Sequence, residues 1–294
     1  MNVLVGGGTG FIGTTLCAEL VERGHDVTAL SRDPSGADLP SAVETYPADV
    51  RDYDDVEPAF ENQDAVVYLV ALSPLFKTPS GLTHEAVHLG GAENTVRAAE
   101  EHGVDRLVHM SGVFADPNAD TAYLRSKGKA EEVVRDSDLE WVVYRPTIVF
   151  GDGDEFKGFV KMLTTPYVTG LPGGGRVRYQ PVWVGDVVPM LADGVEDEDR
   201  AGDTYEIGGP ERLSLADVTR MIYRSEGKSV TILPVPTILA RVGLRVMDPV
   251  PFFPLGADQA KSMDTDLVVE NNAVTEFGVE TADLKTYGQY LGIE

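Results

Sequence analysis

Cysteine is nearly absent from this 294-residue chain, which contains only Cys17. A single thiol cannot build a disulfide framework or a cysteine-based zinc or iron–sulfur site. No uncharged apolar run approaches the roughly 20 residues that a membrane span needs, and no basic leader typical of a signal peptide precedes the first apolar segment. Because 43% of the residues are apolar, we expect a globular, cytoplasmic protein with one large domain or two small ones.

Positive charge is also scarce. Lysine and arginine total 24, of which 8 are lysines, against 48 aspartates and glutamates, so the net charge is −24. Nucleic acid is therefore excluded as a main partner, because phosphate binding needs a basic surface. A diffuse acidic surface that is poor in lysine indicates a protein from a high-salt cytoplasm, where salt screens the repulsion. The alternative is an ordinary acidic protein.

Apolar runs alternate with helical patterns through the first half of the chain. Continuous apolar strands joined by short links to helices are typical of a doubly wound parallel sheet that helices cover on both faces. The sequence therefore predicts an α/β fold with a Rossmann-like sheet. The predicted strands are Asn2–Gly6, Asp26–Leu30, Val43–Tyr46, Ala65–Val70, Arg106–Met110 and Trp141–Tyr144, and the predicted helices are Phe11–Arg23, Asp54–Phe60, Leu82–His102 and Ala122–Arg135.

The character of the sequence changes after Phe150, where glycine and proline become frequent. We expect residues 1–150 to form a dinucleotide-binding domain. Residues 181–195 predict one more strand and helix, which rejoin that sheet. Residues 151–180 and 196–294 would then form a smaller C-terminal lobe.

One apolar stretch, Val230–Phe253, is interrupted by Pro234, Pro236, Arg241 and Arg245. Packing within the lobe is the simplest interpretation. Lining a pocket, docking on a protein complex or contact with a membrane surface remain open.

A glycine-rich turn follows the first predicted strand. Gly7, Gly10 and Gly13 fit G-x-x-G-x-x-G, and Gly8, Gly10 and Gly13 fit G-x-G-x-x-G. Such a turn is tight, lets the backbone approach a pyrophosphate, and presents helix N-terminal amides to the phosphates. A glycine turn that binds nothing is the alternative, but the position between the first strand and helix favours a dinucleotide. The predicted contacts are Gly7, Thr9, Gly10, Phe11, Ile12 and Gly13.

The ends of the next two strands bear on which dinucleotide binds. An arginine after the second strand suits the extra phosphate of NADP, and an acidic residue suits the ribose of NAD. Ser31 and Arg32 therefore favour NADP(H), whereas Asp33 keeps NAD(H) possible. Asp49 and Val50 are expected near the adenine, although Asp49 could instead form an Asx turn.

Tyr123 and Lys127 are four residues apart and so share one face of a predicted helix. A tyrosine has an ordinary pKa near 10, which is too high for proton transfer at neutral pH. A nearby ammonium group favours the phenolate, so Lys127 is expected to lower the pKa of Tyr123. Lys127 can also hold the nicotinamide ribose.

With these motifs the sequence resembles a short-chain dehydrogenase/reductase of the extended kind. Its tail, with 256–259 and 266–268, resembles an atypical branch. That branch includes the NAD(P)H-binding accessory subunit of respiratory complex I and proteins labelled nucleoside-diphosphate-sugar epimerases. The segments that carry the resemblance are 7–13, 48–50, 123–127, 144–151, 182–187 and 205–210.

The resemblance implies roles for several residues. Tyr123 would be the general acid/base and Lys127 its partner. The C-terminal lobe would close over the nicotinamide end of the cofactor. Trp183 and Tyr179 are candidate substrate-lining residues there, with packing in the core as the alternative. The further cofactor contacts that it implies are Val70, Ala71, Leu72 and Pro146.

Two positions depart from the family pattern. Alignment of the fifth strand puts Ser111 at the strand end and Gly112 where a catalytic hydroxyl is usual, although a shift of one residue would restore Ser111 as the catalytic serine. His88 occupies the position of the usual asparagine. These departures leave two hypotheses. One is an NADP(H)-dependent oxidoreductase or nucleotide-sugar epimerase; the other is a non-catalytic NAD(P)H-binding structural or sensing subunit of a respiratory-type complex.

His84, Glu85 and His88 also match the H-E-x-x-H zinc signature. The third ligand position of the longer form is Asn94, a poor zinc ligand, and the segment falls in a crossover helix of the nucleotide fold. We therefore expect no metal. The resemblance suggests a nucleotide sugar, an isoprenoid or a quinone-like molecule as substrate, and the residues do not choose among them.

Overall fold

A computed structural model describes residues 1–239, 255, 258, 261 and 265–293. The chain divides into two compact units. The first contains Met1–Leu72, Thr78–Pro146 and Val184–Glu206; the second contains Ser73–Lys77, Thr147–Trp183 and Ile207–Glu294. Most of the apolar stretch 230–253, from residue 240 on, and much of the tail segment 256–259 lie outside the described residues.

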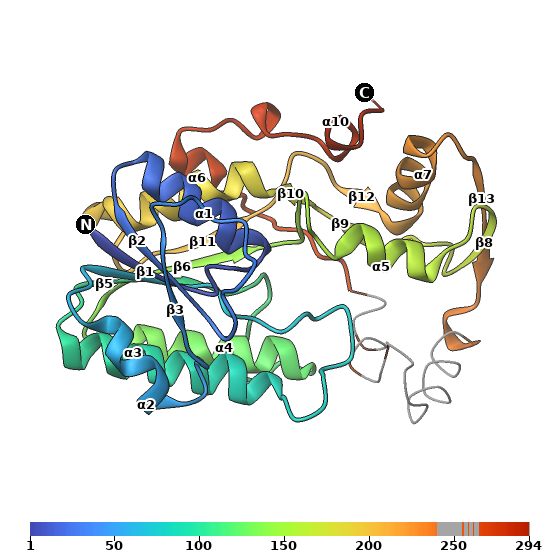
Figure 1. The fold of residues 1–294 in the computed structure, drawn as a ribbon. Helices are drawn as coiled ribbons and strands as arrows, with labels where there is room; N and C mark the ends of the chain where they lie inside the picture. Colours follow the sequence, from blue (N-terminus) through green and yellow to red (C-terminus); the bar gives the residue numbers. More distant parts are fainter. Residues whose placement is uncertain (240–254, 256–257, 259–260, 262–264, 294) are drawn as a thin grey trace. The chain divides into compact units, whose positions relative to one another are not determined.

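A seven-stranded sheet forms the centre of the first unit, in the order β11-β6-β5-β4-β1-β2-β3. Strands β1 to β6 pair in parallel. The predicted α/β class with a Rossmann-like sheet is confirmed (Figure 1). The strands are β1 (Asn2–Gly6), β2 (Asp26–Ser31), β3 (Glu44–Pro47), β4 (Ala65–Tyr68), β5 (Arg106–Met110), β6 (Glu140–Pro146) and β11 (Thr204–Ile207).

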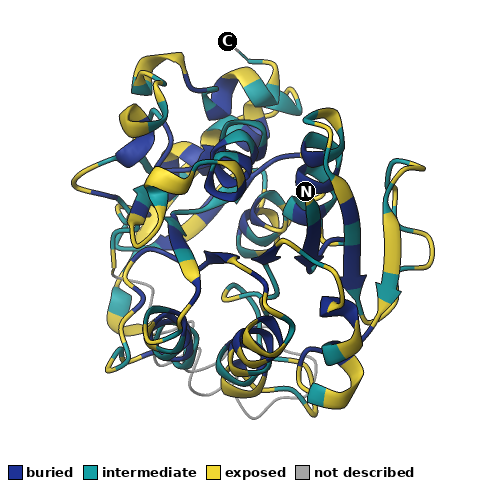
Figure 2. Cartoon of the chain, turned by 90° about the vertical axis from the view of Figure 1, so that its left-hand side faces the viewer, coloured by how far each residue is buried: buried dark blue, intermediate teal, exposed yellow. Residues whose placement is uncertain are grey.

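Helices cover both faces of this sheet, so its central strands are buried throughout (Figure 2). Helices α1 (Phe11–Glu22) and α6 (Val184–Glu196) lie on one face (Figure 1). On the other face, α3 (Gly90–His102) and α4 (Ala122–Arg135) pack with the shorter elements. This burial explains why the strands are continuous apolar runs. The shorter elements are α2 (Tyr53–Val56), the 3₁₀ turns η1 (Glu57–Phe60) and η3 (Glu198–Arg200), and the π-helical turn η2 (Glu85–Leu89).

One prediction about the sheet is wrong. The strand within 181–195 does not join it, because β10 (Val182–Trp183) pairs with β7 (Val149–Phe150) in a separate two-stranded sheet. The seventh strand of the main sheet is β11, next to β6. The chain therefore returns to the first unit through helix α6 and strand β11.

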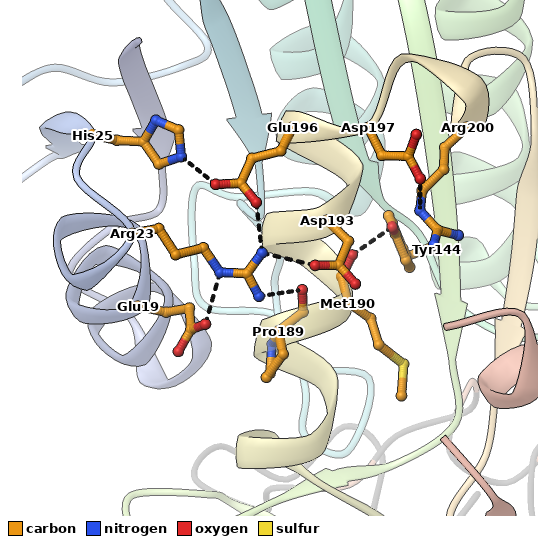
Figure 3. Close-up of polar contacts among 10 residues, drawn as sticks. All are labelled: Glu19, Arg23, His25, Tyr144, Pro189, Met190, Asp193, Glu196, Asp197 and Arg200. Carbon is orange, nitrogen blue, oxygen red and sulfur yellow. Dashed lines mark hydrogen bonds and ion pairs between the residues drawn. The ribbon is translucent and has the colours of Figure 1, made fainter. Parts of the chain in front are cut away.

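An arginine at the end of α1 forms ion pairs with helix α6 (Figure 3). Arg23 lies beyond the end of α1, and its Nη1 is 2.7 Å from Asp193 and 2.7 Å from Glu196 on α6. Its Nε bonds Glu19 at 2.8 Å within α1. Nearby, the Tyr144 hydroxyl donates to the Met190 carbonyl of α6 at 2.6 Å. These polar contacts add to the apolar packing of α6, whose buried residues include Val187, Val188 and Leu191.

The second unit has its own apolar core, which includes Phe150, Phe156, Leu171 and Tyr287. No helix among the described residues is long and apolar enough to cross a membrane. The helices of the second unit are α5 (Phe156–Leu163), α7 (Leu215–Ser225), α10 (Tyr287–Leu291), η4 (Ala273–Phe277) and η5 (Thr281–Asp283). Its further strands are β8 (Tyr167–Pro172), β9 (Arg178–Tyr179), β12 (Leu213–Ser214) and β13 (Val230–Val235).

Candidate functional site

The glycine turn between β1 and α1 is packed so closely that side chains are excluded. A Cβ at Gly13 would lie 2.2 Å from the carbonyl oxygen of Gly7, and a Cβ at Gly8 would lie 2.7 Å from Cβ of Ala29. Gly7 has a φ of +84°, a left-handed conformation that glycine adopts without strain. The glycine pattern is therefore required by the local backbone.

The N-terminus of α1 has no side-chain cap. Gly10 is the N-cap residue, with extended backbone angles, and its lack of a side chain leaves the first amides of the helix without the usual partner. Gly10 is exposed, Thr9, Phe11 and Ile12 are half-buried, and Gly13 is buried. Free amides and the positive end of the helix dipole together suit a phosphate group. The turn thus fits the pyrophosphate of a dinucleotide.

Two charged residues at the end of β2 differ in the hydrogen bonds and ion pairs that they make. Asp33 accepts from the backbone N–H of Ser35 at 3.0 Å and from its hydroxyl at 2.5 Å, and the hydroxyl bond lowers the pKa of Asp33. Arg32 is exposed and has no ion-pair partner within the described part of the chain. Its neighbour Ser31 has a buried hydroxyl that makes no hydrogen bond there. The guanidinium of Arg32 is therefore open to a ligand, and Asp33, whose two bonds both fall on Oδ1, keeps Oδ2 available.

Asp49, after β3, is occupied within its own loop. Its carboxylate accepts from Arg51 Nε at 2.9 Å and Nη2 at 2.6 Å, and from the Arg51 backbone N–H at 3.1 Å. The Arg51 side chain holds the pKa of Asp49 below its usual range. This is the Asx turn considered as the alternative. Val50 is buried, and its carbonyl accepts from Asn94 Nδ2 at 2.9 Å.

The segment after β4 runs beside the glycine turn. A Cβ at Gly7 would lie 3.3 Å from the backbone nitrogen of Val70. Ala71 is exposed, and the Leu72 backbone N–H donates to His88 Nε2 at 2.9 Å. Of the three predicted residues, Val70 is thus close to the predicted pyrophosphate site, and Leu72, two residues on, is held by His88.

Tyr123 lies in the first turn of α4, which the Thr121 hydroxyl caps by accepting from Leu124 N–H at 3.3 Å. Its ring makes edge-on contacts with His84 and His88, at centroid separations of 5.7 and 5.3 Å. A Cβ at Gly112 would lie 3.3 Å from the phenol oxygen. The Tyr123 hydroxyl is therefore directed at the loop that follows β5.

The Lys127 side chain is almost fully buried, with a relative exposure of 1%. Its Nζ donates to the Met110 carbonyl at 2.7 Å. Burial lowers its pKa to about 8, an effect that Glu131 partly offsets. Lys127 thus bonds to the end of β5.

The expected effect of Lys127 on Tyr123 is wrong for this structure. Burial raises the pKa of Tyr123 to about 12, and Lys127 does not counter it. The reason is that spacing along a helix brings two residues to one face but does not direct the ammonium group at the phenol. Here the Met110 carbonyl holds that group.

Ser111 and Gly112 follow β5 and have different surroundings. The Ser111 backbone N–H donates to the Tyr144 carbonyl at 2.7 Å, which continues the pairing with β6. Its hydroxyl is buried and makes no hydrogen bond to the described residues. Position 112, which carries no side chain, is the one that faces Tyr123.

The two histidines of the H-E-x-x-H match have other partners. His88 has both ring nitrogens engaged, with Leu72 N–H and with the Ser126 hydroxyl at 3.0 Å, and Glu85 pairs with Lys129 at 2.9 Å. His84 Nε2 lies 3.2 Å from the Thr78 hydroxyl. Within the described ranges, no group of three or more His, Cys, Asp or Glu residues is arranged to hold a metal ion.

The remaining predicted residues are placed as follows. Pro146 is buried at the end of β6, and its carbonyl accepts from Val113 N–H at 3.1 Å, which fixes the loop after β5. Trp183 and Tyr179 belong to the second unit, where they pack against its core. Lys285 Nζ lies 4.1 Å from the centre of the Trp183 ring. Both aromatic residues are half-buried and contribute to packing in that unit, and their contact with a substrate stays a prediction.

Two features of the site were not predicted. Phe114, in the loop after β5, has a φ of +65° and is 42% exposed. Gly128 lets α4 approach the loop below it, since a Cβ there would lie 2.2 Å from the Asp116 carbonyl carbon. A glycine inside a helical pattern signals such an approach, whereas no sequence signal marks the backbone of Phe114.

The chain is similar in sequence to an NAD(P)H-binding family and to individual known proteins. A model of an NAD(P)H-binding family matches residues 7–166. The chain is 28% identical over 294 residues to the mitochondrial NADH-ubiquinone oxidoreductase 40 kDa subunit of Neurospora crassa, covering 96% of this chain and 76% of that protein. It is 26% identical over 279 residues to the chloroplastic divinyl chlorophyllide a 8-vinyl-reductase of Cucumis sativus, covering 88% and 65%.

Solved structures show the same fold. UDP-glucose 4-epimerase of Thermus thermophilus, in complex with NAD, superposes with a TM-score of 0.71 at 21% identity, over 100% of this chain and 98% of that chain. A nucleoside-diphosphate-sugar epimerase of Staphylococcus aureus gives a TM-score of 0.74 at 17% identity, over 100% of both chains. The resemblance seen in the sequence is confirmed at the level of the family. Since the family model covers more than half of its length, the chain belongs to the NAD(P)H-binding family.

Proposed function

We propose that the chain is an NADP(H)-dependent oxidoreductase or epimerase of the short-chain dehydrogenase/reductase type. The observation that carries the proposal is the uncapped N-terminus of α1, where exposed Gly10 leaves the first helical amides open to a phosphate. A nicotinamide cofactor would supply a hydride donor or acceptor there. The turn residues Gly7 to Gly13, the Val70–Leu72 segment and Pro146 would hold it.

The proposed preference for NADP(H) rests on the end of β2. Arg32 is free of ion pairs in the described structure, and its guanidinium can pair with a phosphate through two hydrogen bonds. Asp33 would contact ribose hydroxyls in an NAD site, but its carboxylate is bound to Ser35. Both of those bonds fall on Oδ1, so Oδ2 of Asp33 could still accept from a ribose hydroxyl, and the preference for NADP(H) rests on Arg32.

Tyr123 is the proposed proton donor. Burial raises the pKa of Tyr123 to about 12, so its phenol is protonated at neutral pH, and it would give that proton to the substrate oxygen as the oxygen gains negative charge from the hydride. Lys127, with a pKa lowered to about 8, exchanges protons near neutral pH and would reprotonate the phenolate once its ammonium leaves the Met110 carbonyl. The resting phenol is therefore in the protonation state that carbonyl reduction requires, whereas oxidation of a hydroxyl group would require the phenolate.

A second candidate function is supported by particular contacts. Lys127 is bound to the Met110 carbonyl, and Gly112 supplies no hydroxyl beside Tyr123. Both features suit a chain that binds NADP(H) without turning it over. The similarity to a subunit of the Neurospora crassa NADH-ubiquinone oxidoreductase supports the same candidate, as a structural or sensing subunit of a larger assembly.

One experiment separates the two candidates. The full chain and its Tyr123→Phe variant would be incubated with NADPH and a panel of small aldehydes, ketones and quinones, and the loss of absorbance at the nicotinamide band followed. We expect the wild type to oxidise NADPH with at least one compound, and Tyr123→Phe to lose this activity while it still binds NADPH. Equal turnover by both proteins would refute the role of Tyr123, and binding without turnover by the wild type would favour the second candidate.

A further inference from the structure

His88 lies on a π-helical turn that neighbouring residues stabilise. In η2 the Gly90 N–H donates to the Glu85 carbonyl, five residues back. The Tyr68 hydroxyl donates to the Val87 carbonyl at 2.7 Å, and Gly91 leaves room for it, since a Cβ there would lie 2.1 Å from the Tyr68 oxygen. Short π turns are rare and occur frequently at functional sites. This one holds His88 with no exposed surface.

The hydrogen bonds of His88 can run in only one direction. The Leu72 backbone N–H can only donate, so His88 Nε2, at 2.9 Å, is the acceptor. A neutral ring then carries its proton on Nδ1, which donates to the Ser126 hydroxyl at 3.0 Å. That hydroxyl in turn donates to the Tyr123 carbonyl at 2.9 Å. The three bonds form a chain from the loop after β4 to the first turn of α4.

We propose that His88 is a positioning residue, which locks the cofactor-side segment Val70–Leu72 to the helix turn that carries Tyr123. The proposal rests on the proposed function, since it takes that segment to contact the cofactor. The His88 ring also packs edge-on against Tyr123, with centroids 5.3 Å apart. An uncharged ring with a fixed tautomer therefore sets both the backbone of the cofactor segment and the orientation of the phenol. An asparagine amide offers the same two functions, an oxygen that accepts and an N–H that donates.

The first test measures NADPH binding to the full chain by cofactor fluorescence. We expect His88→Leu, which fills the space without hydrogen bonds, to weaken binding about tenfold, because Leu72 N–H is left without an acceptor. His88→Asn should recover binding to within about threefold of wild type. Ser126→Ala is the matched control; it removes the acceptor of His88 Nδ1 and the donor to the Tyr123 carbonyl but keeps the bond between Leu72 N–H and His88 Nε2, and it should bind NADPH within about twofold of wild type. Far-UV circular dichroism and thermal melting check that each variant is folded.

The second test needs no cofactor. Nitrogen-15 NMR of the wild type should show His88 with its proton on Nδ1, the less common tautomer, and the signal should not change between pH 8 and pH 5.5. A proton on Nε2, or folded His88→Leu protein that binds NADPH as the wild type does, would overturn the proposal. If the wild type binds neither NADPH nor NADH, the proposed function and the coupling to the cofactor both fail. The tautomer would still decide whether the hydrogen-bond chain exists.

Discussion

The β1–α1 turn and the β5–α4 region both lie at the carboxyl ends of strands in one sheet, yet they are prepared to different degrees. At the turn, close glycine packing and a bare helix N-terminus leave backbone amides ready for a phosphate. In the β5–α4 region, Tyr123 and Lys127 share a helix, but the lysine bonds the Met110 carbonyl and the phenol meets Gly112. Binding by backbone groups is thus formed in advance, whereas proton transfer by side chains requires a rearrangement.

The largest expected effect comes from a side chain added to the turn. Gly13→Ala places a Cβ 2.2 Å from the Gly7 carbonyl oxygen, so the backbone must move. We expect at least about a 100-fold loss of NADPH affinity and a loss of about 1–3 kcal/mol in unfolding free energy. Gly158→Ala, in α5, is the control, because a Cβ there meets no atom within 4 Å. It should bind NADPH normally, and unchanged binding by Gly13→Ala would show that the turn is not the site.

Adding a hydroxyl beside Tyr123 should increase the catalytic activity of the β5–α4 region. Gly112→Ser puts a side chain about where the Tyr123 phenol points, since the Cβ position is 3.3 Å from that oxygen. We expect at least about a tenfold gain in NADPH turnover with the best carbonyl compound of the panel, because a hydroxyl can hold the substrate oxygen. Gly112→Ala is the control for bulk alone. Equal rates for the two variants would mean that the missing hydroxyl is not what limits catalysis.

Acid should destabilise the folded chain through two buried histidines, His88 on η2 beside Tyr123 and His109 on β5. Burial lowers the pKa of His88 to about 2, and it lowers that of His109 well below its usual range. The unfolded chain binds protons at both rings below about pH 6.5 while the folded chain does not. Stability is therefore full above pH 6.5 and is lost as the pH falls, by up to about 1.4 kcal/mol per pH unit for each ring.

Urea unfolding between pH 7.5 and 5.5 measures this slope. His109→Phe is the informative variant, because it removes one titrating ring while a flat ring remains to stack on Tyr68, whose centroid is 5.6 Å away. We expect the unfolding free energy of this variant to fall less steeply with decreasing pH than that of the wild type, by the contribution of about one proton. An unchanged slope would contradict the assignment to His109.

The smallest effect concerns the backbone at Phe114. The Ala115 N–H donates to the Gly112 carbonyl at 3.1 Å, so Phe114 occupies the turn position that glycine favours, with φ of +65°. Phe114→Gly should raise the unfolding free energy by about 1 kcal/mol, since it relieves this strain. Phe114→Ala keeps the strained backbone and is the control. A glycine variant no more stable than the alanine variant would refute the strain.

Much of the fold was accessible from the sequence, because period and composition report burial. The strand Arg106–Met110 and the helix Ala122–Arg135 have the predicted bounds. The helix predicted over Leu82–His102 is divided, because Tyr68 and Gly91 support a π turn that no local pattern reveals. Strand β11 was missed as a member of the sheet, since its place depends on contacts far along the chain.

The glycine turn was also accessible, because its backbone tolerates no other residue. The bonding of Lys127 was not, since the choice between a phenol and a carbonyl depends on a few ångströms at the end of a long side chain. The same holds for Asp33 and Asp49, whose carboxylates bond Ser35 and Arg51. Sequence position identifies the residues at a site, and the hydrogen bonds then decide which of them are open to a ligand.

The central claim is that the turn binds NADP(H) and that Arg32 reads its extra phosphate. The most direct measurement is an equilibrium titration of the full chain and of Arg32→Gln with NADPH and with NADH, in molar KCl, followed by cofactor fluorescence. The account predicts micromolar or tighter NADPH binding by the wild type, preferred about tenfold or more over NADH, and loss of that preference in Arg32→Gln. Preference for NADH, or no binding of either cofactor, would contradict it.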